Sequence, residues 1–303
     1  MPGTILSRYL NPEVLSRIAG QRIEPRDLVI GNLAGSHKSP LSGFAIEFSG
    51  HREYVPGDDP KHIDWRVYFK RGRYVVKQYE METNMVCHFI LDTSASMRYG
   101  EGDEQKLQYA ARMVAALGYA IIHQSDKVSL ATFDEKLGGA VAPSNATAQV
   151  IRFTELLEGS EASGTTALAD CLTQLVGRMR RREIVIILSD FFTTDLDALE
   201  TALQHMRYNR HEVVLFQIMH HDELTFEFDE MTKFIGLEIP EDLLAQPNEI
   251  RRAYLRAMEK FNNRLENICG RNRIERVLVD TSRDMAMLLA DYLHQRSRLN
   301  RGR

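Results

Sequence analysis

The sequence has few cysteines, no long apolar run and little net charge. Its three cysteines, Cys87, Cys171 and Cys269, are scattered and odd in number, which argues against a disulfide framework or a zinc site built from Cys-x-x-Cys pairs. No apolar stretch approaches the roughly 18 residues that a membrane-spanning helix needs. The first residues lack the basic and apolar segments of a signal peptide. We therefore expect a cytoplasmic protein without a membrane span.

The bulk composition is that of a globular protein. The 303 residues are 44% hydrophobic and 26% charged, with a net charge of -4, so the chain as a whole has no preference for nucleic acid or an anionic membrane. This length suits one large domain or one domain with a smaller companion.

Strands and helices alternate from residue 85 onward. Apolar runs at 86–91, 184–188 and 213–219 are typical of strands buried on both faces, and apolar residues at three- and four-residue spacing between them predict helices. The pattern predicts an α/β fold with a doubly wound, mostly parallel sheet and helices on both faces. Segment 220–248 interrupts it, as an extra hairpin or an excursion over the sheet.

A small N-terminal module is expected before this domain, with the division at residues 1–83 and 84–303. Within the module, aromatic and β-branched runs at 65–69 and 74–79 flank a Lys-Arg-Gly-Arg turn, which favours a β-hairpin.

Oxygen-bearing side chains follow the predicted strands where the strands end. Asp92, Ser94 and Ser96 come directly after one buried strand, and Asp190 ends another. Thr165 and Thr166 lie in a Ser-Gly-Thr-Thr loop that opens a helix, and one of the two could supply a further oxygen. Ligands of open α/β sheets bind beyond the carboxyl ends of the strands, and carboxylates and hydroxyls suit Mg²⁺ or Mn²⁺.

This pattern resembles the metal-ion-dependent adhesion site of von Willebrand factor A domains. The resemblance assigns the metal ligands to Asp92, Ser94, Ser96, Thr165 and Asp190, with Thr165 preferred to Thr166 because it follows a glycine. The sequence departs from the family pattern after Asp190, where two phenylalanines replace the familiar glycine. The resemblance implies that a Glu or Asp of a partner protein completes the coordination of the ion.

The upstream residues resemble a bacterial family, the domain-of-unknown-function 58 proteins, which carry such a domain. The residues that carry this resemblance are Gly43, Glu47, Phe48, Arg52, Glu53, Tyr54, Pro56, Gly57, Asp58, Asp59, Ile63, Asp64 and Trp65, and later 234–238. The resemblance implies an adaptor or chaperone-like partner of a MoxR-type AAA+ ATPase, not an enzyme.

Three alternatives stay open. The Ser and Asp residues could serve only as helix caps and turns. A metal-dependent hydrolase is the second alternative, although haloacid dehalogenase phosphatases need an Asp where Ser94 stands, and no activating base is visible for a serine nucleophile. Nucleic-acid binding is the third, through the basic and aromatic residues of 65–77.

Overall fold

The structure is a computed structural model, and it describes residues 5–25, 37–38, 47–80, 82–83, 85–180, 182–193, 195–228, 231–238 and 242–301. The chain divides into two compact units. The large unit comprises Met1–Glu24 and Val86–Arg303, and the small unit is Pro25–Met85. The N-terminal module expected over 1–83 therefore has a different extent, because residues 5–24 group with the large unit.

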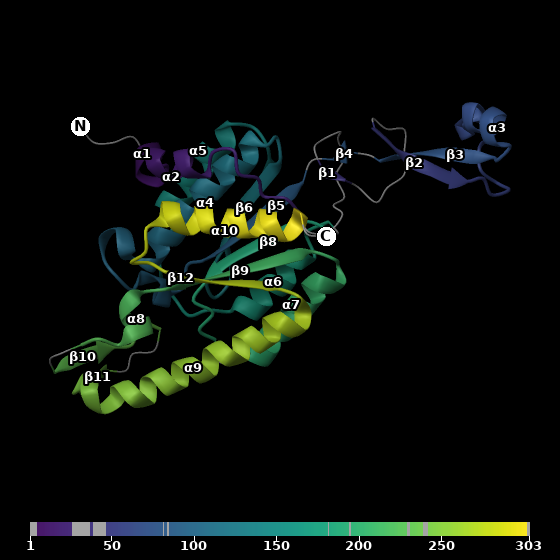
Figure 1. Cartoon of the computed structure of the whole chain (residues 1–303). Helices are drawn as coiled ribbons and strands as arrows, with labels where there is room; N and C mark the ends of the chain where they lie inside the picture. The colour runs from purple at the N-terminus through teal and green to yellow at the C-terminus, as the bar shows by residue number, and fades with distance from the viewer. Residues whose placement is uncertain are drawn as a thin grey trace. The chain divides into compact units, whose positions relative to one another are not determined.

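The large unit is built on a six-stranded sheet in the order β12-β9-β8-β5-β6-β7 (Figure 1). Its strands are β5 (Val86–Asp92), β6 (Lys127–Phe133), β7 (Leu137–Ser144), β8 (Ile184–Ser189), β9 (Glu212–Met219) and β12 (Glu275–Asp280). All neighbouring strands are parallel except the edge strand β7, which runs antiparallel to β6. The strand order reverses between β5 and β8, which defines a doubly wound sheet with its switch point there. The predicted fold class is confirmed.

Helices cover both faces of this sheet (Figure 1). Helices α4, α5 and α10, joined by α1 and α2, form one layer, and α6, α7 and α9 form the other. Their bounds are α1 (Ile5–Tyr9), α2 (Pro12–Ile18), α4 (Lys106–His123), α5 (Ala148–Glu158), α6 (Leu168–Val176), α7 (Leu196–Tyr208), α9 (Pro247–Asn272) and α10 (Met285–Arg301). Helix α5 was not among the predicted elements, although Val150, Phe153 and Leu157 place a buried stripe on it.

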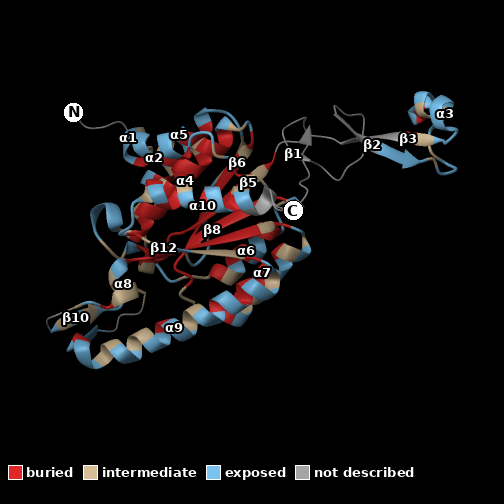
Figure 2. Cartoon of the chain, in the orientation of Figure 1, coloured by how far each residue is buried: buried red, intermediate tan, exposed pale blue. Residues whose placement is uncertain are grey.

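The central strands are buried along almost their whole length (Figure 2). All six residues of β8 are buried, and so are the last six of β5. Their apolar side chains meet helices on both faces, which explains why these strands appear in the sequence as continuous apolar runs. Among the described residues, no helix combines the length and the apolar character that crossing a bilayer requires.

Segment 220–248 forms both a helix and a hairpin. Short helix α8 (His221–Thr225) follows β9 directly, and β10 (Thr232–Ile235) pairs antiparallel with β11 (Asp242–Ala245) before α9 begins. The ring of Phe226, at the end of α8, stacks on Phe234 of β10 and contacts Tyr254 of α9 in a tilted arrangement. The extra hairpin predicted as one of two alternatives is therefore present.

The small unit contains a helix where the sequence predicted the first strand of a hairpin. Residues Trp65–Arg71 form α3, β3 (Val75–Glu80) follows it, and β3 pairs antiparallel with β2 (Glu47–Glu53). Asp64 caps α3, since its carboxylate accepts hydrogen bonds from the N–H groups of Arg66 and Val67. Gly72 ends the helix in the left-handed conformation at φ 66°. The hairpin prediction was wrong because these two caps define a helix despite the β-prone aromatic residues between them.

The signature acids of the small unit make local contacts. Asp58 binds Arg52, Asp59 caps a 3-10 helix (η1, Pro60–His62), and Asp64 also binds His51 at 2.9 Å. The unit also contains the two-residue strands β1 (His37–Lys38) and β4 (Glu82–Thr83), which pair with each other. Gly43 of the signature lies outside the described residues.

Candidate metal site at the carboxyl edge of the sheet

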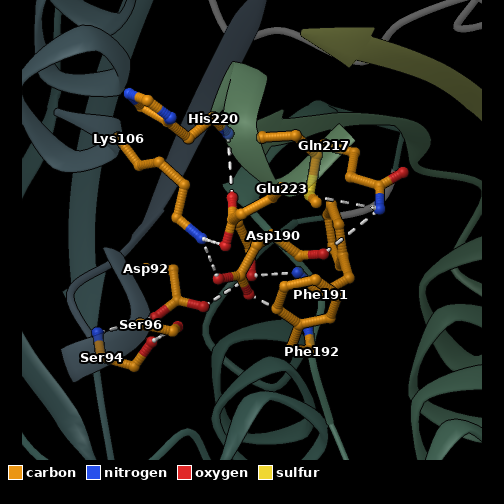
Figure 3. Close-up of polar contacts among 12 residues, drawn as sticks. Asp92, Ser94, Ser96, Lys106, Asp190, Phe191, Phe192, Gln217, His220 and Glu223 are labelled. Carbon is orange, nitrogen blue, oxygen red and sulfur yellow. Dashed lines mark hydrogen bonds and ion pairs between the residues drawn. The ribbon is translucent and has the colours of Figure 1, made fainter. Parts of the chain in front are cut away.

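Two buried aspartates mark the switch point of the sheet. Asp92 is the last residue of β5, and Asp190 directly follows β8, its parallel neighbour. Both residues are 0% exposed. Parallel neighbouring strands bring their carboxyl ends to the same edge, so the two carboxylates converge there (Figure 3).

Asp92 is held by hydrogen bonds to both of its oxygens. Oδ1 accepts from the N–H of Ser94 at 2.8 Å, and Oδ2 accepts from the hydroxyl of Ser189 at 2.5 Å. Burial, together with the nearby charge of Asp190, raises the pKa of Asp92 to about 7. These hydrogen bonds favour the ionised form, but they do not offset the loss of water. Among the described residues, the hydrogen bonds to this carboxylate come from a backbone N–H and a hydroxyl group, not from a cationic side chain.

The two serines lie close to Asp92 in the sequence, at the start of a short 3-10 helix, η2 (Ala95–Arg98), which contains Ser96. Ser94 is fully buried and is the residue just before η2. Its hydroxyl lies 3.0 Å from that of Ser96. Figure 3 shows both side chains on the same side of the site as Asp92. The structure thus brings together four of the predicted ligands, Asp92, Ser94, Ser96 and Asp190.

The threonine loop is fixed next to the serines, but the hydroxyl of Thr165 is used elsewhere. The carbonyl of Gly164 accepts from the N–H of Ala95 at 2.9 Å, which holds the two loops together. The Thr165 hydroxyl bonds Oε1 of the Glu135 side chain at 3.2 Å. The Oγ1 of Thr166, by contrast, is buried and makes no hydrogen bond. Of the two threonines, Thr166 therefore has the oxygen in need of a partner.

Phe191, which stands where the family pattern has a glycine, keeps a backbone conformation typical of glycine. Phe191 is fully buried and has φ 62°, a conformation that L-residues rarely adopt. Its N–H donates to the Ser189 hydroxyl at 2.8 Å, and the N–H of Phe192 donates to Asp190 Oδ1 at 3.0 Å. The turn after β8 is therefore anchored by the site itself, and the buried Phe191 ring holds it in place.

Two charged residues of the site were missed by the sequence analysis. The Nζ of Lys106, the first residue of α4, lies 2.8 Å from Asp190 Oδ2 and 2.9 Å from Glu223 Oε1 (Figure 3). Glu223 belongs to the run His220-His221-Asp222-Glu223 that directly follows β9. It lies on α8 with its side chain 15% exposed, and His220 caps this helix. No periodicity signals the burial of Lys106, because it lies one residue before the apolar stripe of α4.

A divalent cation fits these residues by charge and by ligand type. Asp92, Asp190 and Glu223 carry three negative charges when ionised, and Lys106 carries one positive charge. The remaining two negative charges are what one divalent ion neutralises. Carboxylate and hydroxyl oxygens are the ligands that Mg²⁺ and Mn²⁺ prefer. The buried Thr166 oxygen, which makes no hydrogen bond, is a further oxygen in the adjacent loop that could coordinate an ion.

In the described part of the chain, the candidate site included, no group of three or more His, Cys, Asp or Glu side chains is arranged to hold a metal ion. The candidate site itself has only two carboxylates, Asp92 and Asp190, in its predicted ligand set. Hydroxyl groups would therefore have to complete the coordination of an ion there.

Fold and site together describe a doubly wound α/β domain with a cluster of acidic and hydroxyl groups at its switch point. The chain belongs to the family described as "Protein of unknown function DUF58", whose model matches residues 50–264. An uncharacterized protein of Mycobacterium bovis is 23% identical over 193 residues, which cover 60% of this chain and 58% of the relative. The chain thus matches less than two thirds of that relative's length.

Solved structures similar to this chain include a protein named BatB and a domain named as a VWA domain. The conserved hypothetical protein BatB of Bacteroides thetaiotaomicron is 13% identical, with a TM-score of 0.47 and coverage of 71% of this chain and 100% of the other. The SpRpn10 VWA domain is 11% identical, with a TM-score of 0.39 and coverage of 70% and 95%.

Proposed function

We propose that this chain is a metal-dependent protein-interaction module. In this proposal Asp92, Ser94, Ser96 and Asp190 hold Mg²⁺ or Mn²⁺, directly or through water, with a threonine of the adjacent loop. A Glu or Asp of a partner protein then binds the ion at its open coordination position. The ion supplies the positive charge through which that carboxylate is attracted.

The observation that carries the proposal is the buried Asp92 carboxylate at the switch point. Desolvation of a carboxylate is unfavourable unless a positive charge or a proton compensates it. Lys106 contacts Asp190 and Glu223, which leaves Asp92 with hydroxyl and amide partners only. A divalent ion between Asp92 and the serine hydroxyls would compensate it.

The partner proposed is a MoxR-type AAA+ ATPase or its client, as the family resemblance implies. We further propose a cytoplasmic location, which is supported by the free, buried thiols of Cys87, Cys171 and Cys269. The proposed role is binding and not catalysis.

The experiment is an affinity purification from lysate of the source cells with identification by mass spectrometry. Wild type and Asp92→Asn are compared, each in Mg²⁺ and in EDTA. We expect an ATPase or client that is retained only by wild type in Mg²⁺. Retention that is unchanged in EDTA or by Asp92→Asn would refute the proposal. Mg²⁺-dependent hydrolysis of a phosphate ester, lost in Asp92→Asn, would instead support the hydrolase alternative.

A further inference from the structure

The most unusual feature beside the candidate metal site is a buried ammonium group. The side chain of Lys106 is 0% exposed, and its Nζ lies between Asp190 and Glu223. It also lies 5.5 Å from the centre of the Phe192 ring. A lysine is almost never fully buried unless it is paired, and here two carboxylates share its charge.

The ammonium group and a divalent ion would compete for the same carboxylate. Asp190 Oδ1 already accepts from the N–H of Phe192, and Oδ2 accepts from Lys106 at 2.8 Å. A metal ion that binds Asp190 must therefore share an oxygen with one of these donors. Repulsion between the two cations weakens metal binding by an amount that depends on how closely Lys106 approaches Asp190.

Glu223 draws the ammonium group in the opposite direction. Its Oε1 accepts from Lys106, while Oε2 accepts from the backbone N–H of His220 at 2.9 Å. The backbone carbonyl of Glu223 accepts from the hydroxyl of Tyr254 on α9 at 3.0 Å. The position of this carboxylate is thus set by α8 and its neighbours, which lie outside the predicted ligand set.

We propose that the ammonium group of Lys106 is shared between Asp190 and Glu223, and that the way in which it is shared sets the metal affinity of the site. Lys106 and Glu223 are positioning residues in this scheme, and the inference rests on the proposed metal site. Any movement of α8 that withdraws Glu223 returns the full charge of Lys106 to Asp190 and weakens metal binding. By linkage, metal binding favours the arrangement in which Glu223 holds the ammonium group. Helix α8 is therefore the element through which a bound partner would change metal affinity.

The test compares variants of the two members of one ion pair, for which opposite changes in metal affinity are expected. Mn²⁺ affinity is measured by electron paramagnetic resonance for wild type, Lys106→Met, Glu223→Gln and the double variant. We expect Lys106→Met to bind Mn²⁺ about tenfold more tightly, because a repelling charge is removed. Glu223→Gln should bind about tenfold more weakly, because Lys106 then pairs with Asp190 alone. The double variant should return close to wild type.

A purely structural role for the pair predicts a different pattern, in which both single variants bind more weakly. Glu223→Gln that binds as tightly as wild type, or a double variant weaker than Glu223→Gln, would overturn the inference. If Lys106→Met does not fold in thermal unfolding assays, the comparison of Glu223→Gln with the double variant gives the same sign test. Absence of Mn²⁺ binding by wild type would instead refute the proposed metal site, so the two failures are distinguishable.

Discussion

Replacing Asp92 with asparagine should stabilise the metal-free protein, even though it removes a proposed metal ligand. Burial and the charge of Asp190 raise the pKa of Asp92 from 3.8 to about 7. At pH 8 this shift corresponds to a penalty on the order of 4 kcal/mol for ionising the buried carboxyl group. Asparagine carries no charge but loses one acceptor oxygen, which costs about 1 kcal/mol. The net gain in the free energy of unfolding is then about 3 kcal/mol.

The gain should depend on pH with a defined sign. A carboxyl group whose pKa is higher in the folded than in the unfolded state stabilises the fold while it is protonated. That contribution is lost as the pH rises through the folded-state pKa of about 7. In EDTA, wild type should therefore gain stability between pH 8 and pH 5, and the advantage of Asp92→Asn should shrink over the same interval.

The assay is thermal unfolding followed by circular dichroism in EDTA at both pH values. For a unit of this size, each kcal/mol should shift Tm by about 2–4 °C. Asp126→Asn is the matched control, because Asp126 is equally buried but lies just before β6, at the opposite edge of the sheet. Saturating Mg²⁺ should stabilise wild type and not Asp92→Asn. A lower Tm for Asp92→Asn at pH 8 in EDTA would refute this reasoning.

Further predictions concern the threonine loop and the small unit. Thr166→Ala should weaken Mn²⁺ binding more than Thr165→Ala, because only the Thr166 oxygen is buried without a partner; equal effects in a Mn²⁺ titration would contradict this. Asp64→Ala should destabilise α3 by about 1 kcal/mol through loss of its cap. Because Trp65 is the single tryptophan, tryptophan fluorescence should report this change in urea unfolding while the circular dichroism transition of the large unit stays unchanged. For the nucleic-acid alternative, Phe69 is 82% exposed, so Phe69→Ala should weaken binding of single-stranded DNA in anisotropy measurements only if that alternative holds.

The sequence predicts the central sheet well because its strands are buried on both faces. Continuous apolar runs ending in Asp92 and Ser189 leave little choice of structure, and parallel pairing follows from the helices between them. The convergence of the four proposed ligands at the switch point could be predicted for the same reason. Each lies at or just beyond the carboxyl end of a strand.

Features that depend on contacts between distant residues could not be predicted. The burial of Lys106 results from its pairing with Glu223, which is 117 positions away in the chain, and no local pattern encodes such a contact. The helix at 65–71 was missed because aromatic residues favour strands, while the caps at Asp64 and Gly72 decide the local structure. The involvement of the Thr165 hydroxyl with Glu135 is likewise a contact across 30 positions.

The measurement that tests the proposed metal site most directly is a Mn²⁺ titration of the whole chain followed by electron paramagnetic resonance. Wild type and Asp126→Asn should show saturable binding at a single site that Mg²⁺ displaces, and Asp92→Asn should lose it. Binding by Asp92→Asn that equals wild type, or no saturable binding by wild type, would contradict a metal site at Asp92, Ser94, Ser96 and Asp190.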